Sequence, residues 1–513
     1  MTPTEKFQIV ASVIAGLAVI GFLLPGRDQK GAEARHAGSL AVLVATWLLL
    51  GGSLVSRHDA DRAWDRVSSL PRIGLTVVAL AVAVVVCILL VRLLLARPVI
   101  WFVLLAVSLP IRIPVSLGSQ SANLLVPLYA VVGLGVIVWI VGRRTGRFPA
   151  PTSRSLWIDG TTAAFTAMTL ISVWWSDDLQ EATIKIVCFY IPFVILLRLV
   201  ASLWPHADRP LRAMVTTTVA MAVGVAGLAV FQFATGTIWW NTTLEKANIY
   251  NRFFRANSIF YDPNILGRYL ALTIVVSIVV ISVSREDTRV WLLTAACVVM
   301  AAGLIVTFSR SSAIMLMVAL FLVALRLFGV KRTLLVTVSA LVLIGGPAMI
   351  AKESVRDKFT SVSKLAGSGE GRFRLAEGGV DLWKTSPVHG VGLGAFAERY
   401  AETFPEHDRR RTRVFISHTA PVTVLAELGA IGLGLFVLMG LGAAVALARV
   451  SRSPGDDGLI AWTTLAVLIG IFFHSLLYSA LFEDPYTWML LGLAAALYAA
   501  RTPPEERVPA TTS

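Results

Sequence analysis

Apolar stretches long enough to form membrane-spanning helices follow one another along almost the whole chain, separated by polar connections. A helix needs about 20 mostly apolar residues to cross the hydrocarbon core of a bilayer, which is about 30 Å thick. The pattern therefore predicts an all-α polytopic membrane protein with about 14–15 transmembrane helices. The expected spans are residues 8–24, 39–55, 74–95, 98–115, 123–141, 157–174, 183–203, 211–234, 264–283, 290–308, 311–328, 333–351, 421–448, 459–480 and 486–500.

One polar segment, residues 352–420, is much longer than the others. We expect a partly helical extracytoplasmic loop that caps an active site, because chemistry at a membrane needs a polar, water-accessible platform. The predicted parts of the chain are N-terminal extra transmembrane helices (1–97), a membrane core (98–351), the loop (352–420), closing transmembrane helices (421–500) and a disordered cytoplasmic tail (501–513).

The charge of the connections predicts their side of the membrane, because cytoplasmic loops carry an excess of Lys and Arg. Basic residues mark the connections at 142–154, 209–212, 284–289, 330–332 and 448–452. We expect the alternate connections outside, namely 174–181, 235–264, 307–312 and 352–418. The first three spans give no clear orientation, and an odd number of spans would put the N-terminus outside.

Composition agrees with a membrane protein. The 513 residues are 56% hydrophobic and 15% charged, whereas soluble domains carry about 25% charged residues. The net charge of +14 would suggest nucleic-acid binding in a soluble protein. Cytoplasmic Lys and Arg explain it here, and we expect no nucleic-acid partner. Cys87, Cys188 and Cys297 lie in apolar segments, without the spacing of a disulfide framework or a metal site.

The long loop carries more basic than acidic residues, against the trend for an outer segment. Long loops escape that trend, so a solvated surface is one interpretation. An anion site is the other, because Arg binds phosphate oxygens through two parallel hydrogen bonds. The basic residues are Lys352, Arg356, Lys358, Lys364, Arg372, Arg374, Lys384, Arg399, Arg409, Arg410, Arg411 and Arg413.

A second outer segment places arginines just before a predicted membrane helix. Arg252 and Arg255 precede the sequence Asp262-Pro263-Asn264. Asp before Pro is typical of a helix start, since Asp caps free backbone amides and Pro fits the first turn.

Four further ionisable residues lie at or inside predicted membrane helices. Arg310 lies in a very short connection, so its guanidinium must lie at the membrane interface, where a charge is a functional-site hypothesis by default. Snorkelling, or pairing with Asp177, is the competing explanation. His418 abuts an apolar helix and is a candidate general base, or a simple helix cap. Glu427 and His474 are secondary candidates or satisfied buried polar groups.

Three other motifs carry weaker signals. The glycine-rich sequence GVGLG at 390–394 has no strand before it, so we do not interpret it as a nucleotide-binding loop. The acidic pairs at 176–178 and 483–485 lack a convincing ligand set for a divalent cation. We expect neither metal nor cofactor.

Several motifs, in this order, resemble the O-antigen ligase and O-antigen polymerase superfamily. They are WWSDD, RANSIFYDPN, TFSRSS, GEGRFRLAEGGVDLWKTSPVHGVGLGAF and SHTAPVTVLAELGAIG, and the resemblance covers roughly residues 98–500. It implies a polytopic glycosyltransferase that uses polyprenyl-diphosphate-linked glycans at the outer face of the bacterial inner membrane.

The resemblance also implies residue roles. Arg255 and Arg310 would bind the diphosphate, Arg372 would help, and His418 would act on the acceptor. Thr419 stands where the family usually has Asn, a departure that bears on the choice of donor or acceptor. The catalytic candidates are therefore His418, Arg310 and Arg255. The substrate-binding candidates are Arg252, Arg372, Asp262, Asn264, Glu427 and His474.

The expected reaction is metal-independent, inverting transfer of a glycan from a polyprenyl-diphosphate carrier to a hydroxyl of an envelope glycan or glycolipid in the membrane. Arginines would neutralise the leaving group and a His would accept the proton. A transporter or flippase of the same lipid is the alternative, and it should show broken helices, ionisable residues near the midplane and internal repeats. A cell-wall glycan polymerase would need a loop carboxylate such as Glu370, Glu377 or Asp381. Ligase and polymerase remain equally compatible with the sequence.

Overall fold

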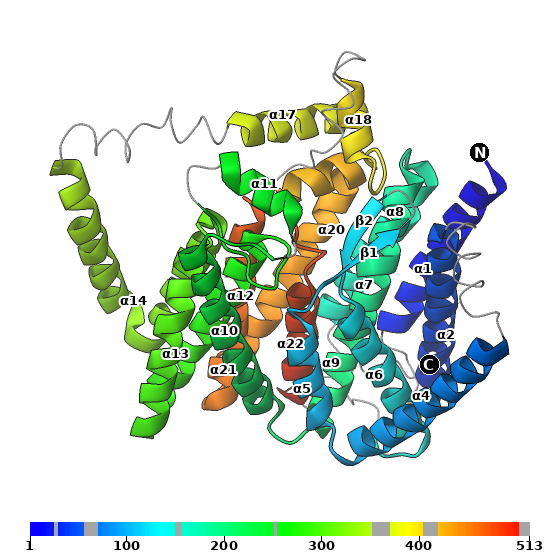
Figure 1. Cartoon of the computed structure of the whole chain (residues 1–513), viewed down its shortest axis with the longest axis horizontal. Coiled ribbons are helices and arrows are strands. Elements are labelled where there is room, and N and C mark those ends of the chain that lie inside the picture. Colours follow the sequence, from blue (N-terminus) through cyan, green and yellow to red (C-terminus); the bar gives the residue numbers. More distant parts are fainter. Residues whose placement is uncertain are drawn as a thin grey trace, which may run out of the picture.

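The apolar stretches fold into a bundle of helices that run roughly side by side (Figure 1). The computed structural model describes residues 1–24, 29–55, 70–117, 120–148, 156–239, 241–250, 254–350, 370–403 and 419–501. The helices are α1 (Pro3–Leu23), α2 (Gln29–Leu54), α4 (Leu70–Ala96), α5 (Val99–Ser108), α6 (Val126–Arg144), α7 (Thr161–Ile171), α8 (Leu179–Lys185), α9 (Ile191–Leu203), α10 (Pro210–Thr235), α11 (Thr242–Tyr250), α12 (Pro263–Val283), α13 (Asp287–Ile305), α14 (Arg310–Ile350), α17 (Glu370–Thr385), α18 (Phe396–Glu402), α20 (Ala420–Val450), α21 (Asp456–Ser475) and α22 (Pro485–Arg501). Short π or 3-10 turns are η1 (Leu156–Gly160), η2 (Ser172–Trp175), η3 (Ile186–Tyr190) and η4 (Trp204–His206).

The all-α polytopic fold class is confirmed. Within the described ranges, 12 helices are long and apolar enough to cross a membrane. Three expected spans differ in length or division: one is a shorter helix, and two share a single helix that is among the 12. The span 486–500 is α22, with 17 residues. The spans 311–328 and 333–351 form the two parts of α14, which is interrupted at Gly329, where φ is 76°.

The expected span 98–115 is wrong in its second part. Helix α5 has only 10 residues and ends at Ser108. Strands β1 (Ile113–Leu117) and β2 (Gln120–Leu124) follow and pair antiparallel, with Ile113 opposite Leu124. Pro110 and Pro114 explain the interruption, because Pro has no backbone N–H to continue a helix.

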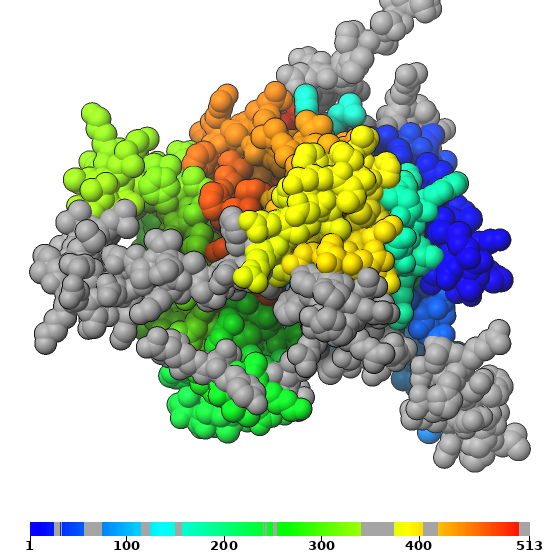
Figure 2. Space-filling view, turned by 90° about the horizontal axis from the view of Figure 1, so that it is seen from above, coloured from blue at the N-terminus to red at the C-terminus, as the bar shows by residue number. Residues whose placement is uncertain are grey.

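The N-terminus lies at the same end of the bundle as α11, α17 and α18 (Figure 1). We call this the loop end. An N-terminus on the side of the long loop is what an odd number of spans requires, while the membrane side of the loop end stays a prediction. Seen from the loop end, α17 and α18 (yellow) cover the bundle beside α20 and α21 (orange; Figure 2).

Two regions of the bundle differ sharply in burial. Every residue of α9 is buried, and so is α22 from Pro485 to Leu497. These two helices pack closely, with Gly492 facing the backbone of Leu197. Helix α4 instead exposes apolar side chains such as Leu75 and Leu80, as a helix that faces lipid requires.

Candidate active site

The start of α12 has the predicted cap. Asp262 has extended backbone geometry, and its carboxylate accepts a hydrogen bond of 2.6 Å from the backbone N–H of Asn264. Pro263 occupies the first turn. The predicted turn and helix start are therefore correct, and the Asp262 carboxylate acts at least as a helix cap.

Arg255 is held in one orientation by three partners. Its Nε donates to the carbonyl of Thr307 at 2.9 Å, and its Nη2 donates to Oδ1 of Asn264 at 3.1 Å. The Asn248 side chain, on α11, both donates to and accepts from the Arg255 backbone, at 3.1 Å in each case. The guanidinium is partly buried, so it is a preorganised cation beneath α11.

The turn before α14 is joined to the Arg255 segment. Ser309 Oγ donates to Asn264 Oδ1 at 2.8 Å, and the Ala256 N–H donates to the carbonyl of Val306 at 3.1 Å. Phe308 has a φ of 49°, a left-handed geometry that costs a non-glycine residue energy and is found at functional sites. Arg310 is the exposed first residue of α14. The structure thus brings together the segments that carry Arg255, Asn264 and Arg310.

A buried glutamine fixes the other side of this unit. Gln232 on α10 accepts from the backbone N–H of Ser258 at 2.7 Å and donates to its carbonyl at 3.2 Å. Ser258 also has a left-handed φ, of 52°. The amide of Gln232 therefore holds a strained loop in place. Its only signal in the sequence was a polar residue inside an apolar stretch.

Three predicted site residues cannot be placed. Arg252 and His418 lie outside the described residues, and of Arg372 only its position in the backbone of α17 is described. Thr419 lies next to His418 and donates from Oγ1 to the carbonyl of Leu476 at 3.1 Å.

The described part of the long loop packs against α20. Leu375 and Leu382 of α17 form a small apolar cluster with Phe396 and Tyr400 of α18 and with Ala426. Helix α17 is amphipathic, and its apolar face is the buried one. The described part of the loop is therefore partly helical, as predicted.

Some basic loop residues are paired with acids. Arg399 contacts Asp177 at 2.7 Å and Glu402 at 3.3 Å, and Lys384 contacts Asp381 at 2.7 Å. Asp177, considered above for Arg310, is thus engaged by Arg399. Because these pairs are exposed, their contribution to stability is small.

The GVGLG sequence closes a break in α20. Helix α20 is interrupted at Gly429, where φ is 66°. The backbone N–H groups of Val391 and Gly392 donate to the carbonyls of Ala426 and Glu427, at 3.0 and 2.8 Å. The N–H of residue 430, just beyond the break, donates to the carbonyl of residue 387 at 2.9 Å. Backbone groups freed inside a membrane must find partners, and the glycine-rich loop supplies them.

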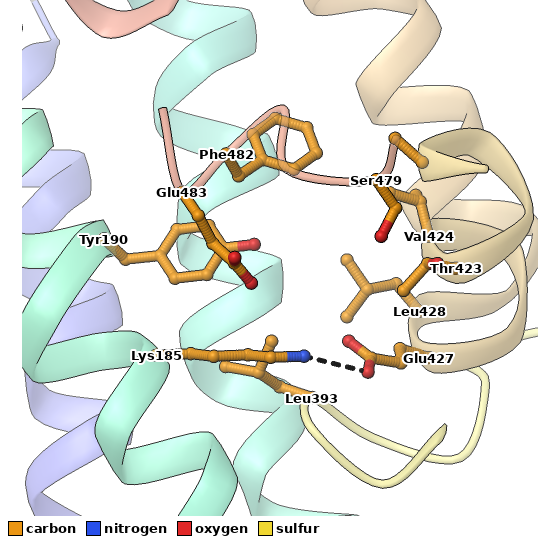
Figure 3. A pocket seen from close by; sticks show the side chains of 11 residues that line it. Lys185, Tyr190, Leu393, Thr423, Val424, Glu427, Leu428, Ser479, Phe482 and Glu483 are labelled. Carbon is orange, nitrogen blue, oxygen red and sulfur yellow. Dashed lines mark hydrogen bonds and ion pairs between the residues drawn. The ribbon is translucent and has the colours of Figure 1, made fainter. Parts of the chain in front are cut away.

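The predicted candidate Glu427 lies beside this break and forms an interior ion pair. Its Oε1 is 3.1 Å from Nζ of Lys185, and both side chains are buried. The pair borders a cavity of about 40 Å³, which Tyr190, Ser479 and Glu483 also line (Figure 3). Sequence reasoning missed Lys185, although an ionisable residue inside a predicted span was signal enough.

The predicted candidate His474 lies fully buried at the end of α21. The ring lies near Arg268 and within reach of the Asn264 backbone, and neither ring nitrogen has a hydrogen-bond partner of good geometry within the described structure. Arg268 pairs with Asp484 at 3.0 Å. Within the acidic pair at 483–485, Asp484 is thus engaged by Arg268. Among the described residues no group of three His, Cys, Asp or Glu side chains could hold a metal ion.

Comparison with known families concerns the part of the chain from α13 into α20. Residues 295–437 match the family model described as O-Antigen ligase. This part of the chain is similar to the O-antigen ligase family. This confirms the resemblance to the O-antigen ligase and polymerase superfamily over these residues. The matched segment contains the Arg310 turn, the long loop, His418 and the Gly429 break, while Arg255 precedes it. No curated protein matches the chain.

Proposed function

We propose that this multi-pass protein of the O-antigen ligase and polymerase type transfers a glycan from a polyprenyl-diphosphate carrier to a hydroxyl of an envelope glycan or glycolipid. The reaction takes place at the outer face of a bacterial cytoplasmic membrane, and the loop end of the bundle faces outward. The observation that carries the proposal is the joined pair of segments that present Arg255 and Arg310 at one place. The held guanidinium of Arg255, with that of Arg310 on the adjoining turn, suits a diphosphate, and Arg stays charged at any working pH.

Each step of the transfer has a residue that can perform it. The acceptor oxygen attacks the anomeric carbon, the bond from that carbon to the diphosphate oxygen breaks, and the acceptor proton moves to His418. Arg255 and Arg310 stabilise the negative charge that develops on the leaving diphosphate, without a metal. One direct displacement inverts the anomeric carbon.

The remaining candidates have supporting roles in this proposal. Arg252 and Arg372 add positive charge for the donor. Asn264 holds Arg255 at 3.1 Å, and Asp262 sets the start of the helix that carries Asn264. We place Glu427 in the wall of the cavity, and we assign His474, which is not among the residues that line it, a supporting role beside Arg268.

Transfer in proteoliposomes tests the proposal. Wild type receives a polyprenyl-diphosphate glycan and envelope acceptors, and product and released polyprenyl diphosphate are measured. His418→Ala and Arg310→Ala should lower transfer by at least about 100-fold, the usual range for a general base or an electrostatic stabiliser. Arg399→Ala, an arginine already paired with Asp177 and Glu402, should transfer at the wild-type rate. A product with retained anomeric configuration would contradict the direct displacement.

A transporter of the same lipid-linked glycan is the second candidate. The break in α20 and the ion pair Lys185–Glu427 inside the bundle favour it, since transporters use broken helices and interior charges. The same proteoliposomes decide between the two functions: movement of donor across the bilayer without glycan transfer would identify a transporter.

A further inference from the structure

The cavity between α8, η3, α20 and the connection at 476–484 has room for a few small groups. Its volume is about 40 Å³, and one water needs roughly 10–15 Å³ on this scale. A whole sugar ring or a polyprenyl chain does not fit. The hydroxyl-bearing edge of a sugar does.

Three polar side chains face this cavity and make no hydrogen bond within the described part of the chain. They are Tyr190, which is buried and only 6% exposed, and Ser479 and Glu483, which are partly buried (Figure 3). A buried polar group without a partner is costly. The cavity therefore calls for an occupant that can both donate and accept hydrogen bonds.

Local geometry aims two of the lining residues at the same space. In an α-helix, residues five apart point about 140° away from each other. The chain after Lys185 instead forms the π turn η3, which ends at Tyr190. The wider turn lets both side chains enter the cavity from one side (Figure 3), and such turns are frequent at functional sites.

The charges around the cavity narrow the chemistry of the occupant. Among the described residues that line the cavity, Lys185 is the only Lys or Arg, and Glu427 neutralises it at 3.1 Å, so the lining does not favour a phosphate or a carboxylate. Burial raises the pKa of Glu483, while Lys185 and Arg112 act in the opposite direction. A carboxyl group that keeps its proton more readily can donate to a hydroxyl as well as accept from it.

We propose that this cavity is a sugar subsite, in which Tyr190, Ser479 and Glu483 bind the hydroxyl or hydroxymethyl edge of one pyranose ring of the glycan. The inference rests on the proposed glycan transfer and adds the residues that select the sugar. Lys185 and Glu427 form the charged wall of the subsite. Ordered water is the other source of the same hydrogen-bonding chemistry, and the test separates the two.

Binding of free sugars can be measured without any transfer activity. The purified full chain is mixed with the methyl glycosides of glucose, galactose, mannose and N-acetylglucosamine, and saturation-transfer NMR detects contact. We expect at least one glycoside to bind, and its 6-deoxy or other deoxy analogue to bind about tenfold more weakly, as loss of a hydrogen bond to a buried partner predicts. Tyr190→Phe and Glu483→Gln should weaken the parent glycoside about as much and should not weaken that deoxy analogue further.

Tyr129→Phe is the matched control for the tyrosine change. Its hydroxyl donates to the carbonyl of Cys188 at 2.7 Å and does not line the cavity, so its loss should affect stability and leave glycoside binding unchanged. If none of the glycosides shows saturation transfer, or if wild type and both cavity variants bind equally well, water fills the cavity. Either result would overturn the subsite.

Kinetics distinguish this inference from the proposed function. If wild type transfers glycan and both cavity variants keep its KM for the lipid-linked donor and for the acceptor, the subsite is overturned and the transfer stands. If glycosides bind in a Tyr190-dependent manner but no transfer occurs, the subsite stands and the transfer reaction is overturned. Raised KM with wild-type thermal stability supports both.

Discussion

Two buried ion pairs in the interior of this bundle have almost the same length and different surroundings. Lys185–Glu427 measures 3.1 Å and its side chains are 8% and 6% exposed. Arg268–Asp484 measures 3.0 Å, with both side chains 2% exposed. Lys185 and Glu427 line the cavity described above, and Arg268 and Asp484 are not among its lining residues. Glu483, which precedes Asp484 in the chain, lines the cavity beside Lys185–Glu427. Two neighbouring carboxyl groups thus have different surroundings.

The difference lies in the backbone partners of each pair and not in complete satisfaction, because Arg268 Nη2 and Asp484 Oδ2 have no hydrogen-bond partner of good geometry in the described structure. Asp484 accepts from the backbone N–H of Tyr486 at 3.2 Å, and Arg268 also donates to the carbonyl of Ala480 at 3.3 Å. This pair ties α12 to the segment before α22, and it has the pattern of a structural element. The Lys185–Glu427 pair has open space beside it, so its hydrogen-bonding capacity is available to a ligand. A buried charge is thus a site candidate when it borders a cavity.

We call Arg268–Asp484 the sealed pair and Lys185–Glu427, which borders the cavity, the open pair. Breaking the sealed pair should have the largest effect on stability. Asp484→Ala leaves the Arg268 charge buried and uncompensated, and such changes cost about 3–5 kcal/mol. Glu427→Ala should cost less, because water in the cavity can solvate Lys185. Thermal unfolding of both variants in the same detergent measures the difference. Equal losses of thermal stability would show that the cavity does not set the two pairs apart.

The glycine-rich loop beside the open pair should tolerate no side chain. Gly390 and Gly146 both have a φ of 71°, which costs any other residue about 1–2 kcal/mol. A methyl group on Gly390 would also lie 2.4 Å from the Glu427 carbonyl, whereas nothing lies within 4 Å of one on Gly146. Gly390→Ala should therefore lower the unfolding temperature clearly more than Gly146→Ala. Similar unfolding temperatures would contradict the packing of this loop into the α20 break.

Replacing both partners of the open pair should separate stability from binding. Exchange of a buried ion pair for apolar residues of similar volume is often neutral or stabilising. We expect Lys185→Met with Glu427→Leu to unfold within a few degrees of wild type, while glycoside binding and transfer fall about tenfold as the charged wall is lost. The single variant Glu427→Leu leaves the Lys185 charge buried without its partner. It is the control and should be less stable than the double variant. Unchanged binding in the double variant would make the open pair purely structural.

Features decided by nearby residues could be predicted from the sequence. The Asp262 cap acts within three residues, and the interruption of α14 falls at Gly329, next to the basic turn predicted at 330–332. Pro110 and Pro114 were visible but were given too little weight, so the hairpin was missed. The succession of long apolar stretches was enough to predict the fold class, because a helix must be long and apolar to cross a bilayer.

The features that were missed depend on residues far apart in the chain. Lys185 and Glu427 are separated by 242 positions, and the sequence around either residue does not indicate that the two form a pair. The break at Gly429 is stable only because residues 387–392 fold back onto it. Such contacts depend on tertiary packing, and a single sequence does not encode that packing as a local pattern.

The smallest expected effect is the pH dependence of stability that Glu483, in the cavity wall, contributes. Burial raises the pKa of this carboxyl above its ordinary value of 4.5, so the folded state holds the proton more tightly than the unfolded state. Its contribution to stability is therefore full below pH 4.5 and is lost as pH rises through the raised pKa. The unfolding temperature of wild type should fall relative to that of Glu483→Gln over this interval, and the two curves should run parallel at higher pH. Parallel curves over the whole range would mean that Glu483 titrates as an exposed carboxyl group, which is incompatible with its place in the cavity wall.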